Sequence, residues 1–224
     1  IYDQTEKGNG KCYVLDREPI MTTRKSTIDM LREHEEMSAF TELLEGSSLL
    51  EVMHDKKYGC VSDNISTFNT YNYTVYVPTN ESIRALQQAG KLPTWEKVAE
   101  EAEAGQLQAK TADSLAIENF LQYHIQDGAL FIGATPQAQD GYETALIGKN
   151  NKFAKVYPTL TADQIYIKTT ESDNNPAKVV KGDGTYNIMA REYIVNAEDK
   201  LNASSLYTSS TAVIHLIDKP LIYK

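Results

Sequence analysis

Two stretches decide the fold of this chain: TVYVPTNES at Thr74–Ser82 and TAVIHLIDKPLI at Thr211–Ile222. Each begins with a run of apolar and β-branched residues, which is typical of a β-strand. In the second stretch Val213, His215 and Ile217 alternate with their neighbours, so their side chains are predicted to share one face of a sheet. The first stretch then turns into a helix, whereas the second ends the chain.

The first stretch contains its own stop signal. Its two valines alternate with Thr74 and Tyr76, which predicts a half-buried strand with a period of two. Pro78 has no N–H to donate to a sheet, so the strand is expected to end there. Thr79 or Asn80 is then expected to cap a helix.

The first half of the chain is predicted to be largely helical. Ser26 is a candidate N-cap, with Asp29 three residues further on as its acidic capping partner. Apolar side chains then recur at helical spacing in several segments. Helices are expected over residues 26–45, 49–53, 80–89, 95–108 and 113–126.

After residue 128 the pattern changes to short strands and turns. Two hairpins are predicted, one around Asn150-Asn151 and one around Gly182-Asp183-Gly184. The expected strands are Ala145–Ile147, Phe153–Tyr157, Ile165–Ile167, Val179–Lys181, Tyr186–Ala190, Tyr193–Val195 and Val213–Ile217. Helices followed by strands indicate an α+β fold and not the alternating βαβ pattern of a nucleotide-binding sheet.

Charge and composition exclude several classes of partner. The 31 acidic and 22 basic residues give a net charge of −9, which argues against nucleic acid, because phosphate binding requires clustered Lys and Arg. The chain has no D-x-D-x-D-G calcium loop, and we expect neither a metal nor a cofactor. No apolar run approaches the roughly 18–20 residues that span a bilayer. Since the chain opens with Ile1 and has no leader-like segment, we expect any export signal or anchor to lie outside it.

The two cysteines and the glycosylation sequons leave alternatives open. Outside the cell Cys12 and Cys60 could form a disulfide, and otherwise they are two separate thiols. The N-x-S/T sequons would carry surface glycans in a secreted eukaryotic protein, or they are chance matches in a bacterial one. These sequons begin at Asn64, Asn72, Asn80 and Asn202.

Motifs for nucleotide binding and for catalysis are absent from the sequence. It contains no GxxxxGK[ST], no GxGxxG, no GxSxG and no HExxH. His34 and His54 lie among charged residues and are expected to be solvated. His124 and His215 lie in apolar surroundings, where each is predicted to bond a carbonyl, a hydroxyl or a carboxylate that links two elements. A catalytic pair of His215 with Asp218 is disfavoured, because the two side chains point to opposite faces of one strand.

Aromatic residues are the main candidates for surface contacts. The chain has 14 Tyr, and Tyr71, Tyr73 and Tyr76 lie close together, so they could form a patch that binds protein or sugar. The alternative is ordinary packing at the edge of a sheet. The single tryptophan, Trp95, either contacts a partner or fastens its acidic helix to the core.

Three segments in this order resemble the signatures of the fasciclin domain family. TVYVPTNESIRAL, beginning at Thr74, is similar to the family's strand that runs into PTN and a helix. FLQYHI contains its central Tyr-His pair at Tyr123 and His124, and TAVIHLIDKPLIYK is similar to the closing signature NGVVHVIDKVLLP. Pro220 departs from that closing pattern. The residues of this chain that match the structural signature are Thr74, Pro78, Thr79, Asn80, His215 and Asp218.

The resemblance implies a fold and a domain organisation. We expect a fasciclin-like β-sandwich or wedge of short, mostly antiparallel strands with several helices packed along it. Residues 1–25 are predicted to be an N-terminal arm or the tail of a preceding unit, and residues 26–224 a single domain. Extra length is placed near residues 55–72, 90–112 and 169–184. The composition is also similar to that of surface lipoproteins from gut Bacteroidetes.

The resemblance also implies a function. We expect a non-enzymatic, extracellular, cell-surface adhesion module that recognises a protein or matrix partner, with tandem domains in the full-length protein. The candidate ligand-binding residues are Tyr71, Tyr73, Tyr76, Tyr123 and His124. One alternative is a surface component that binds glycans or a small ligand. A second alternative is a hydrolase that uses His124 or His215, and solvent access to these imidazoles would distinguish it.

Overall fold

The fold was analysed in a computed structural model, which describes residues 25–49, 72–133, 141–148, 151–182, 184–195 and 206–223. Several sequence predictions lie outside these residues: the N-terminal arm up to residue 24, both cysteines, Tyr71 and the sequons at Asn64 and Asn202.

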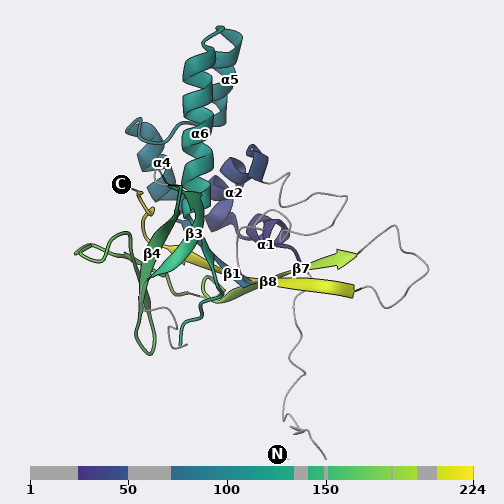
Figure 1. Ribbon diagram of the computed structural model, residues 1–224, viewed down its shortest axis with the longest axis vertical. Coiled ribbons are helices and arrows are strands. Elements are labelled where there is room, and N and C mark those ends of the chain that lie inside the picture. The colour runs from purple at the N-terminus through teal and green to yellow at the C-terminus, as the bar shows by residue number, and fades with distance from the viewer. Residues whose placement is uncertain are drawn as a thin grey trace, which may run out of the picture.

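The helices precede most of the strands along the chain (Figure 1). The helices are α1 (Thr27–Glu33), the short 3-10 helix η1 (Glu35–Met37), α2 (Ser38–Glu45), α4 (Asn80–Gln88), α5 (Trp95–Glu103) and α6 (Leu107–Tyr123). The strands are β1 (Asn72–Pro78), β2 (Ile125–Asp127), β3 (Tyr142–Ile147), β4 (Phe153–Leu160), β5 (Ile165–Lys168), β6 (Ala177–Lys178), β7 (Ile188–Val195) and β8 (Leu206–Ile217).

The strands form one eight-stranded sheet in the order β6-β5-β4-β3-β2-β1-β8-β7. Among the strands that the structure describes, only the central pair of β1 and β8 is parallel, and the other neighbours are antiparallel. This confirms the predicted α+β class and its mostly antiparallel strands. The sheet curls, because Val179, just after β6, bridges to Ile217 at the end of β8.

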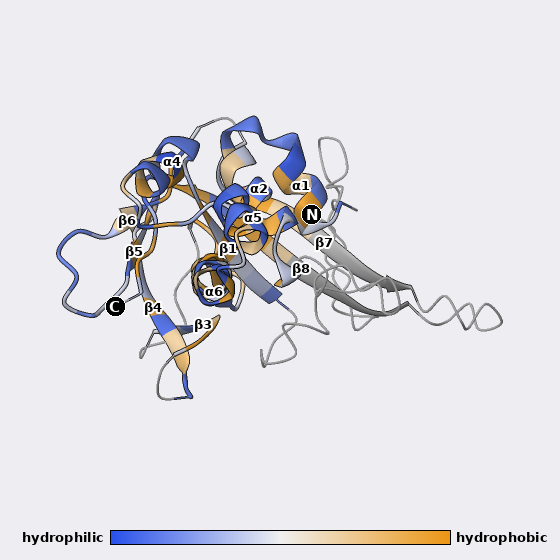
Figure 2. Cartoon of the chain, turned by 90° about the horizontal axis from the view of Figure 1, so that it is seen from above, coloured by the Kyte–Doolittle hydropathy of each residue, from blue (hydrophilic) through white to orange (hydrophobic). Residues whose placement is uncertain are grey.

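The curled sheet has a hydrophobic core on each face. On one face Tyr73, Val75 and Val77 of β1 pack in a cluster with residues of α1, α2 and α6. On the other face, inside the curl, Tyr76 and Ile217 pack with residues of β3, β4 and β5. Figure 2 shows the hydrophobic stretches of the helices turned toward the middle of the molecule, where β1 runs. The prediction of a half-buried β1 is therefore wrong: six of its seven residues are buried, because tertiary packing covers both faces.

Several of the caps, strand ends and turns predicted from local sequence signals are present in the structure. The Ser26 hydroxyl accepts a hydrogen bond from the Asp29 backbone N–H at 3.2 Å, as expected for the cap of α1. The strand β1 ends at Pro78. The hairpin between β3 and β4 turns at Asn151, whose φ of 56° is a left-handed conformation that Asn adopts more readily than most residues.

Two predicted connections are wrong. The helix expected over residues 113–126 is α6, which begins at Leu107 and ends at Tyr123, because the next residues join the sheet beside β1 as β2. The hairpin expected around Gly182 does not form, since β6 pairs with β5, and β7 pairs with β8. In both cases a long-range strand pairing overrides the local turn signal.

The helices α5 and α6 form an antiparallel pair that stands away from the rest of the molecule (Figure 1). Lys97 of α5 forms ion pairs with Glu101 on the same helix and with Asp113 of α6. At the base of the pair the Trp95 indole N–H donates to the Leu43 carbonyl at 2.8 Å, and the ring packs against the helical core. Trp95 therefore fastens α5 to α2, the second of the two roles expected for it.

Replacing Gly46 by alanine is expected to destabilise the fold through Trp95. A Cβ atom at this position would lie 2.5 Å from two atoms of the indole ring, which is held by its hydrogen bond. Overpacking of this kind costs about 1–3 kcal/mol. The free energy of unfolding can be measured by urea titration with the fluorescence of the single tryptophan. Gly182→Ala is the control, because its nearest neighbour would be 3.4 Å away. Equal stability of the two variants would contradict the packing of Trp95 on Gly46.

Candidate functional site

The residues of the family signatures gather around β1 and the end of β8. Thr74 and Tyr76 of β1 lie beside Val213 and His215 of β8 in the parallel pair. Tyr76 and His215 are fully buried, and their rings stack with centroids 6.3 Å apart. We call this group, together with His124, the signature cluster.

Thr74 and Tyr76 hold β2 and the residues that follow it. The Thr74 hydroxyl donates to the Gly128 carbonyl at 2.8 Å and accepts from the Leu130 N–H at 2.9 Å. The Tyr76 hydroxyl donates to the Gln126 side-chain oxygen at 2.7 Å. Burial raises the pKa of the Tyr76 hydroxyl far above its usual value, so this group remains protonated.

His215 fastens two more segments to the same place. Its Nε2 lies 2.7 Å from the Leu130 carbonyl, and its Nδ1 lies 3.3 Å from the Asn187 N–H. A carbonyl only accepts and an N–H only donates, so the proton of the neutral ring is on Nε2. Asn187 itself has a φ of 51°, and its side-chain oxygen accepts from the Ile132 N–H at 2.8 Å. The sequence analysis missed Asn187 and Gln126, because nothing in their local patterns indicates these long-range contacts.

His124 joins the end of α6 to the end of the chain. Its Nδ1 lies 2.7 Å from the Phe120 carbonyl, and its Nε2 lies 3.0 Å from the Leu221 N–H. The proton is therefore on Nδ1, the opposite tautomer to that of His215. The ring also packs on Phe120, with centroids 4.3 Å apart. Leu221 is another residue that the sequence analysis did not connect with the signature.

Burial keeps both imidazoles uncharged at neutral pH. Desolvation lowers the pKa of His124 and that of His215 to about 4 each, and a hydrogen bond to a backbone carbonyl only partly opposes the shift. Both side chains are fully buried, and both nitrogens of each ring are bound by backbone groups. In this state neither ring has a nitrogen left for proton transfer to a substrate.

The tyrosines predicted to bind a ligand lie in the interior wherever the structure describes them. The Tyr73 hydroxyl lies 2.6 Å from the Thr27 hydroxyl of α1. The Tyr123 hydroxyl lies 3.1 Å from the Lys155 carbonyl and 3.4 Å from the Thr169 carbonyl. Tyr73, Tyr76 and Tyr123 are each at least 98% buried. Their contribution to ligand binding stays a prediction, and their burial counts against direct contact with a partner.

Asn80 has a different role from the predicted helix cap. It is the first residue of α4, and the preceding residue, Thr79, is the N-cap without a capping side-chain bond. The Asn80 side chain reaches the start of α2, where its oxygen accepts from the Ala39 N–H at 2.9 Å. Its amide nitrogen donates to the Glu35 carbonyl at 2.9 Å and to the Ser38 hydroxyl at 3.0 Å. A glycan on this nitrogen would displace one of these bonds.

Replacing Asn80 by alanine is expected to destabilise the domain by about 1–3 kcal/mol, because the Ala39 N–H and the Glu35 carbonyl lose their partner. Chemical denaturation measures the effect. Gln88→Ala, which removes an exposed amide from the same helix, is the control and should change stability by less than about 0.5 kcal/mol. A stability of Asn80→Ala equal to that of the control would contradict the bridging role.

Asp218 closes the curled sheet. Its carboxylate accepts from the Lys178 N–H at 2.8 Å, and its own N–H donates to the Lys178 carbonyl at 2.9 Å. These two bonds join β6 to the residue after β8. Asp218 thus has a structural partner of its own, away from the His215 ring.

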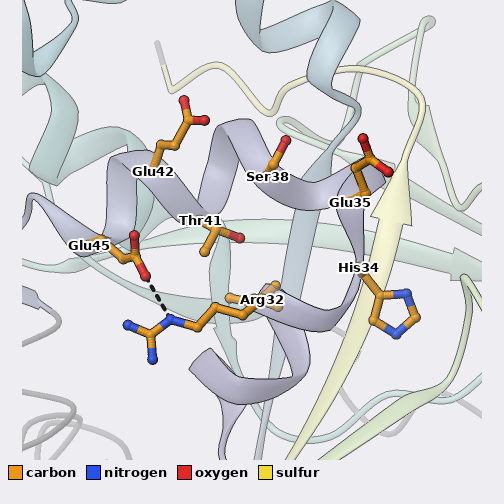
Figure 3. A pocket seen from close by; sticks show the side chains of 8 residues that line it. Arg32, His34, Glu35, Ser38, Thr41, Glu42 and Glu45 are labelled. Carbon is orange, nitrogen blue, oxygen red and sulfur yellow. Dashed lines mark hydrogen bonds and ion pairs between the residues drawn. The ribbon is translucent and has the colours of Figure 1, made fainter.

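A shallow hollow of about 190 Å³ lies between α1 and α2 (Figure 3). Glu35, Glu42 and Glu45 contribute to its lining, and Glu45 forms an ion pair with Arg32 at 2.7 Å. His34 bonds to Glu36 at 3.0 Å. Figure 3 shows the Glu42 and Ser38 side chains directed away from the Arg32–Glu45 pair, so these polar groups do not converge on one point.

Two further structural results concern metals and membranes. Within the described ranges, no three His, Cys, Asp or Glu side chains come together in a way that could hold a metal ion. In the same part of the chain, none of the helices combines the length and the apolar character that crossing a membrane requires.

Comparison with known proteins identifies the family. The Fasciclin domain family matches residues 35–223, most of the chain. None of the curated proteins matches it significantly. Among solved structures, the chain is similar to a FAS1 domain pair from the insect cell adhesion molecule fasciclin I, with 11% identity and a TM-score of 0.46. That match covers 88% of this chain and 51% of the insect chain, so this chain spans about half its length. The extent of the family match shows that this chain belongs to the fasciclin domain family.

Proposed function

We propose that this chain is an extracellular binding module, which attaches to a protein or matrix partner through its outer surface and catalyses no reaction. One observation supports this above all others: the two histidines of the signature cluster are buried and bound at both ring nitrogens by backbone groups. A hydrolase that used His124 or His215 would need one of these nitrogens within reach of a substrate.

The hollows of the molecule also favour surface recognition. Sites for small ligands usually have volumes of about 300–1,000 Å³ and a few convergent polar groups. The hollow between α1 and α2 is smaller than this. A wider depression of about 530 Å³ lies at the tip of the α5–α6 pair, and its lining within the described part of the chain is the consecutive run Gly105 to Ala109. An open turn of this kind is poorly suited to enclosing a ligand.

The residues that contact the partner are proposed to be exposed ones. Tyr186 and Tyr223 are 40% and 43% exposed, and they are the described tyrosines most accessible to a partner. Tyr123 and His124 are proposed to support binding only by stabilising the fold. Tandem copies in the full-length protein and a location at the cell surface are part of the same proposal.

The test is an array of matrix proteins and glycans probed with the purified chain. We expect binding to a protein spot that weakens in Tyr186→Ala or Tyr223→Ala while the melting temperature stays the same. The buried variant Tyr123→Phe should lower the melting temperature and leave binding by the folded fraction intact. Binding to glycan spots alone would favour the glycan-binding alternative, and an array that stays blank would leave a scaffolding role.

A parallel screen with ester, glycoside and peptide substrates tests the non-enzymatic part of the proposal. We expect no turnover above that of a heat-denatured sample. Turnover by the purified chain that is lost in a folded His215→Gln variant would overturn the proposal in favour of the hydrolase.

A further inference from the structure

Charge is distributed unevenly along the chain. Residues 141–182, which contain β3 to β6, have six lysines and four acidic residues, whereas the rest of the chain has 16 basic and 27 acidic residues. The net charge of this part is therefore +2, and that of the rest is −11. A locally positive region is where an otherwise acidic protein attracts a negatively charged partner.

The strands β4, β5 and β6 turn one face of the sheet outward. Their buried residues, such as Val156 and Ile167, belong to the core inside the curl, and the residues between them are partly or fully exposed. In Figure 2 these strands lie along one side of the molecule, opposite α1 and β7. We call the outward set the lysine–tyrosine face: Lys155, Tyr157, Thr159, Tyr166, Lys168 and Lys178.

The strand register places the three lysines on one diagonal line. Tyr157 of β4 lies directly opposite Lys168 of β5. Tyr166 of β5 lies directly opposite Lys178 of β6. Lys168 is therefore a diagonal neighbour both of Lys155 and of Lys178, and such neighbours lie roughly 7–8 Å apart. The two tyrosines occupy the positions beside this line, so cationic and aromatic groups alternate across the three strands.

Two contacts agree with this arrangement. The Lys178 ammonium group lies over the Tyr166 ring, 5.8 Å from its centroid, so these side chains are on the same side of the sheet. The Tyr157 ring lies against Gly141, where a Cβ atom would come within 2.8 Å of two ring atoms. The partly exposed Tyr157 ring therefore covers the glycine and lies along the surface of the sheet.

The positive charge of the face is concentrated on β5 and β6. Lys97 elsewhere in the molecule forms ion pairs with two carboxylates, whereas Lys168 and Lys178 have no ion-pair partner among the acidic side chains that the structure describes. On β3 the partner position of Lys155 is Glu143, which offsets charge at the other end of the line. An anion is therefore expected to bind first at Lys168 and Lys178.

The nearby carboxylates lie at strand ends and in loops, not between the lysines. Asp218, which follows β8, accepts a hydrogen bond from the Lys178 N–H at 2.8 Å. Asp173, in the loop after β5, accepts from the Thr169 N–H and from its hydroxyl, each at 3.2 Å. These carboxylates thus bind groups of the protein itself, and the outward positions between the lysines are held by the two tyrosines.

We propose that the lysine–tyrosine face binds an acidic polysaccharide, a chain of sugars that bear carboxylates. The carboxylates would bind the ammonium groups of the lysines, and the C–H faces of the sugar rings would pack on Tyr157 and Tyr166. An open face of three strands suits an extended chain better than a small ligand, which is usually enclosed. The inference does not depend on the proposed protein partner, which is assigned to Tyr186 and Tyr223.

A polysaccharide fits this face better than a nucleic acid does. Phosphate sites are typically built from clustered Lys and Arg, and this face has three lysines and no arginine. A nucleic acid, with a phosphate on every nucleotide, would also be repelled by the charge of −11 on the rest of the chain.

Binding to immobilised polygalacturonate tests the inference. We expect saturable binding that weakens as salt is added, and no binding to the fully methyl-esterified polymer, which has the same sugars without the charge. The double variant Lys168→Gln, Lys178→Gln should bind about tenfold more weakly. The control, Lys91→Gln with Lys110→Gln, removes the same charge from exposed positions outside the face and should bind within about twofold of the original chain.

A second set of variants tests the aromatic part of the face and separates it from the proposed protein contact. Tyr166→Leu, which removes the ring and keeps apolar bulk, should weaken binding to polygalacturonate about threefold at an unchanged melting temperature. Tyr186→Ala should leave this binding unchanged.

Three results would overturn the inference: no binding to polygalacturonate, equal binding to the methyl-esterified polymer, or equal affinity of the two double lysine variants. Tighter binding of a thymidine oligonucleotide that depends on Lys168 and Lys178 would assign the face to nucleic acid instead.

Discussion

The variant His215→Ala is expected to lose about 3–6 kcal/mol of folding free energy. It leaves the Leu130 carbonyl and the Asn187 N–H without their partner, and each such loss costs about 1–3 kcal/mol in the interior. The cavity left by the ring adds to this cost. Because domains of this size are stable by only about 5–15 kcal/mol, the variant should melt at a much lower temperature or fail to fold.

Two further measurements keep this prediction testable if His215→Ala does not fold. His34→Ala replaces a partly buried histidine that bonds to the Glu36 carboxylate on the outside of the core, and it should change the free energy of unfolding by less than about 1 kcal/mol. His215→Gln retains one donor and one acceptor and should have intermediate stability. In both His215 variants, the molecules that remain folded should bind the partner as well as the original chain does. Normal stability with lost binding would show that His215 contacts the ligand.

Lowering the pH from 7 to 4 is expected to destabilise the domain by several kcal/mol through the same two histidines. Their pKa values are about 4 in the folded state and 6.5 in the unfolded chain. Between these values the unfolded state binds more protons, so stability is complete above about pH 6.5 and decreases as the pH falls toward 4. Each pKa unit corresponds to 1.36 kcal/mol, which gives on the order of 3 kcal/mol for each ring.

Urea titrations between pH 7 and pH 4 measure this loss, and NMR spectra of the histidine rings identify its cause. Two rings should remain neutral at pH 5, with the proton of His124 on Nδ1 and that of His215 on Nε2. Observing these two opposite tautomers would attribute the loss of stability to the two histidines and not to the protonation of carboxylates. A ring signal of either residue that titrates near pH 6.5 in the folded protein would contradict its burial.

Short-range signals in the sequence predicted many of the elements correctly. Ser26 caps α1, Pro78 ends β1, and Asn150-Asn151 marks the hairpin of β3 and β4, because each effect depends only on neighbouring backbone groups. The alternation of Val213, His215 and Ile217 likewise placed His215 on an inward face. The bonding of both buried histidines to backbone carbonyls also agrees with the role expected for them.

Predictions failed where a distant segment decides the environment. The sequence alternation in β1 predicted a half-buried strand, yet the curled sheet also encloses Tyr76 on the other face of that strand. Of the two residues expected to cap α4, Thr79 takes the N-cap position, whereas the Asn80 amide bonds to the start of α2, about 40 residues earlier. The hairpin expected at Gly182 gave way to the pairing of β7 with β8. None of these partners lies within the range of a local pattern.

The sequence alone determined the family, the α+β class and the placement of an imidazole on the inward side of the last strand. These properties follow from residue spacing and backbone chemistry, which act over a few residues. Only the tertiary structure decided which groups bind the two imidazoles and that the described signature tyrosines are buried. Such features depend on contacts between segments as far apart as His124 and Leu221, and chain folding alone brings those segments together.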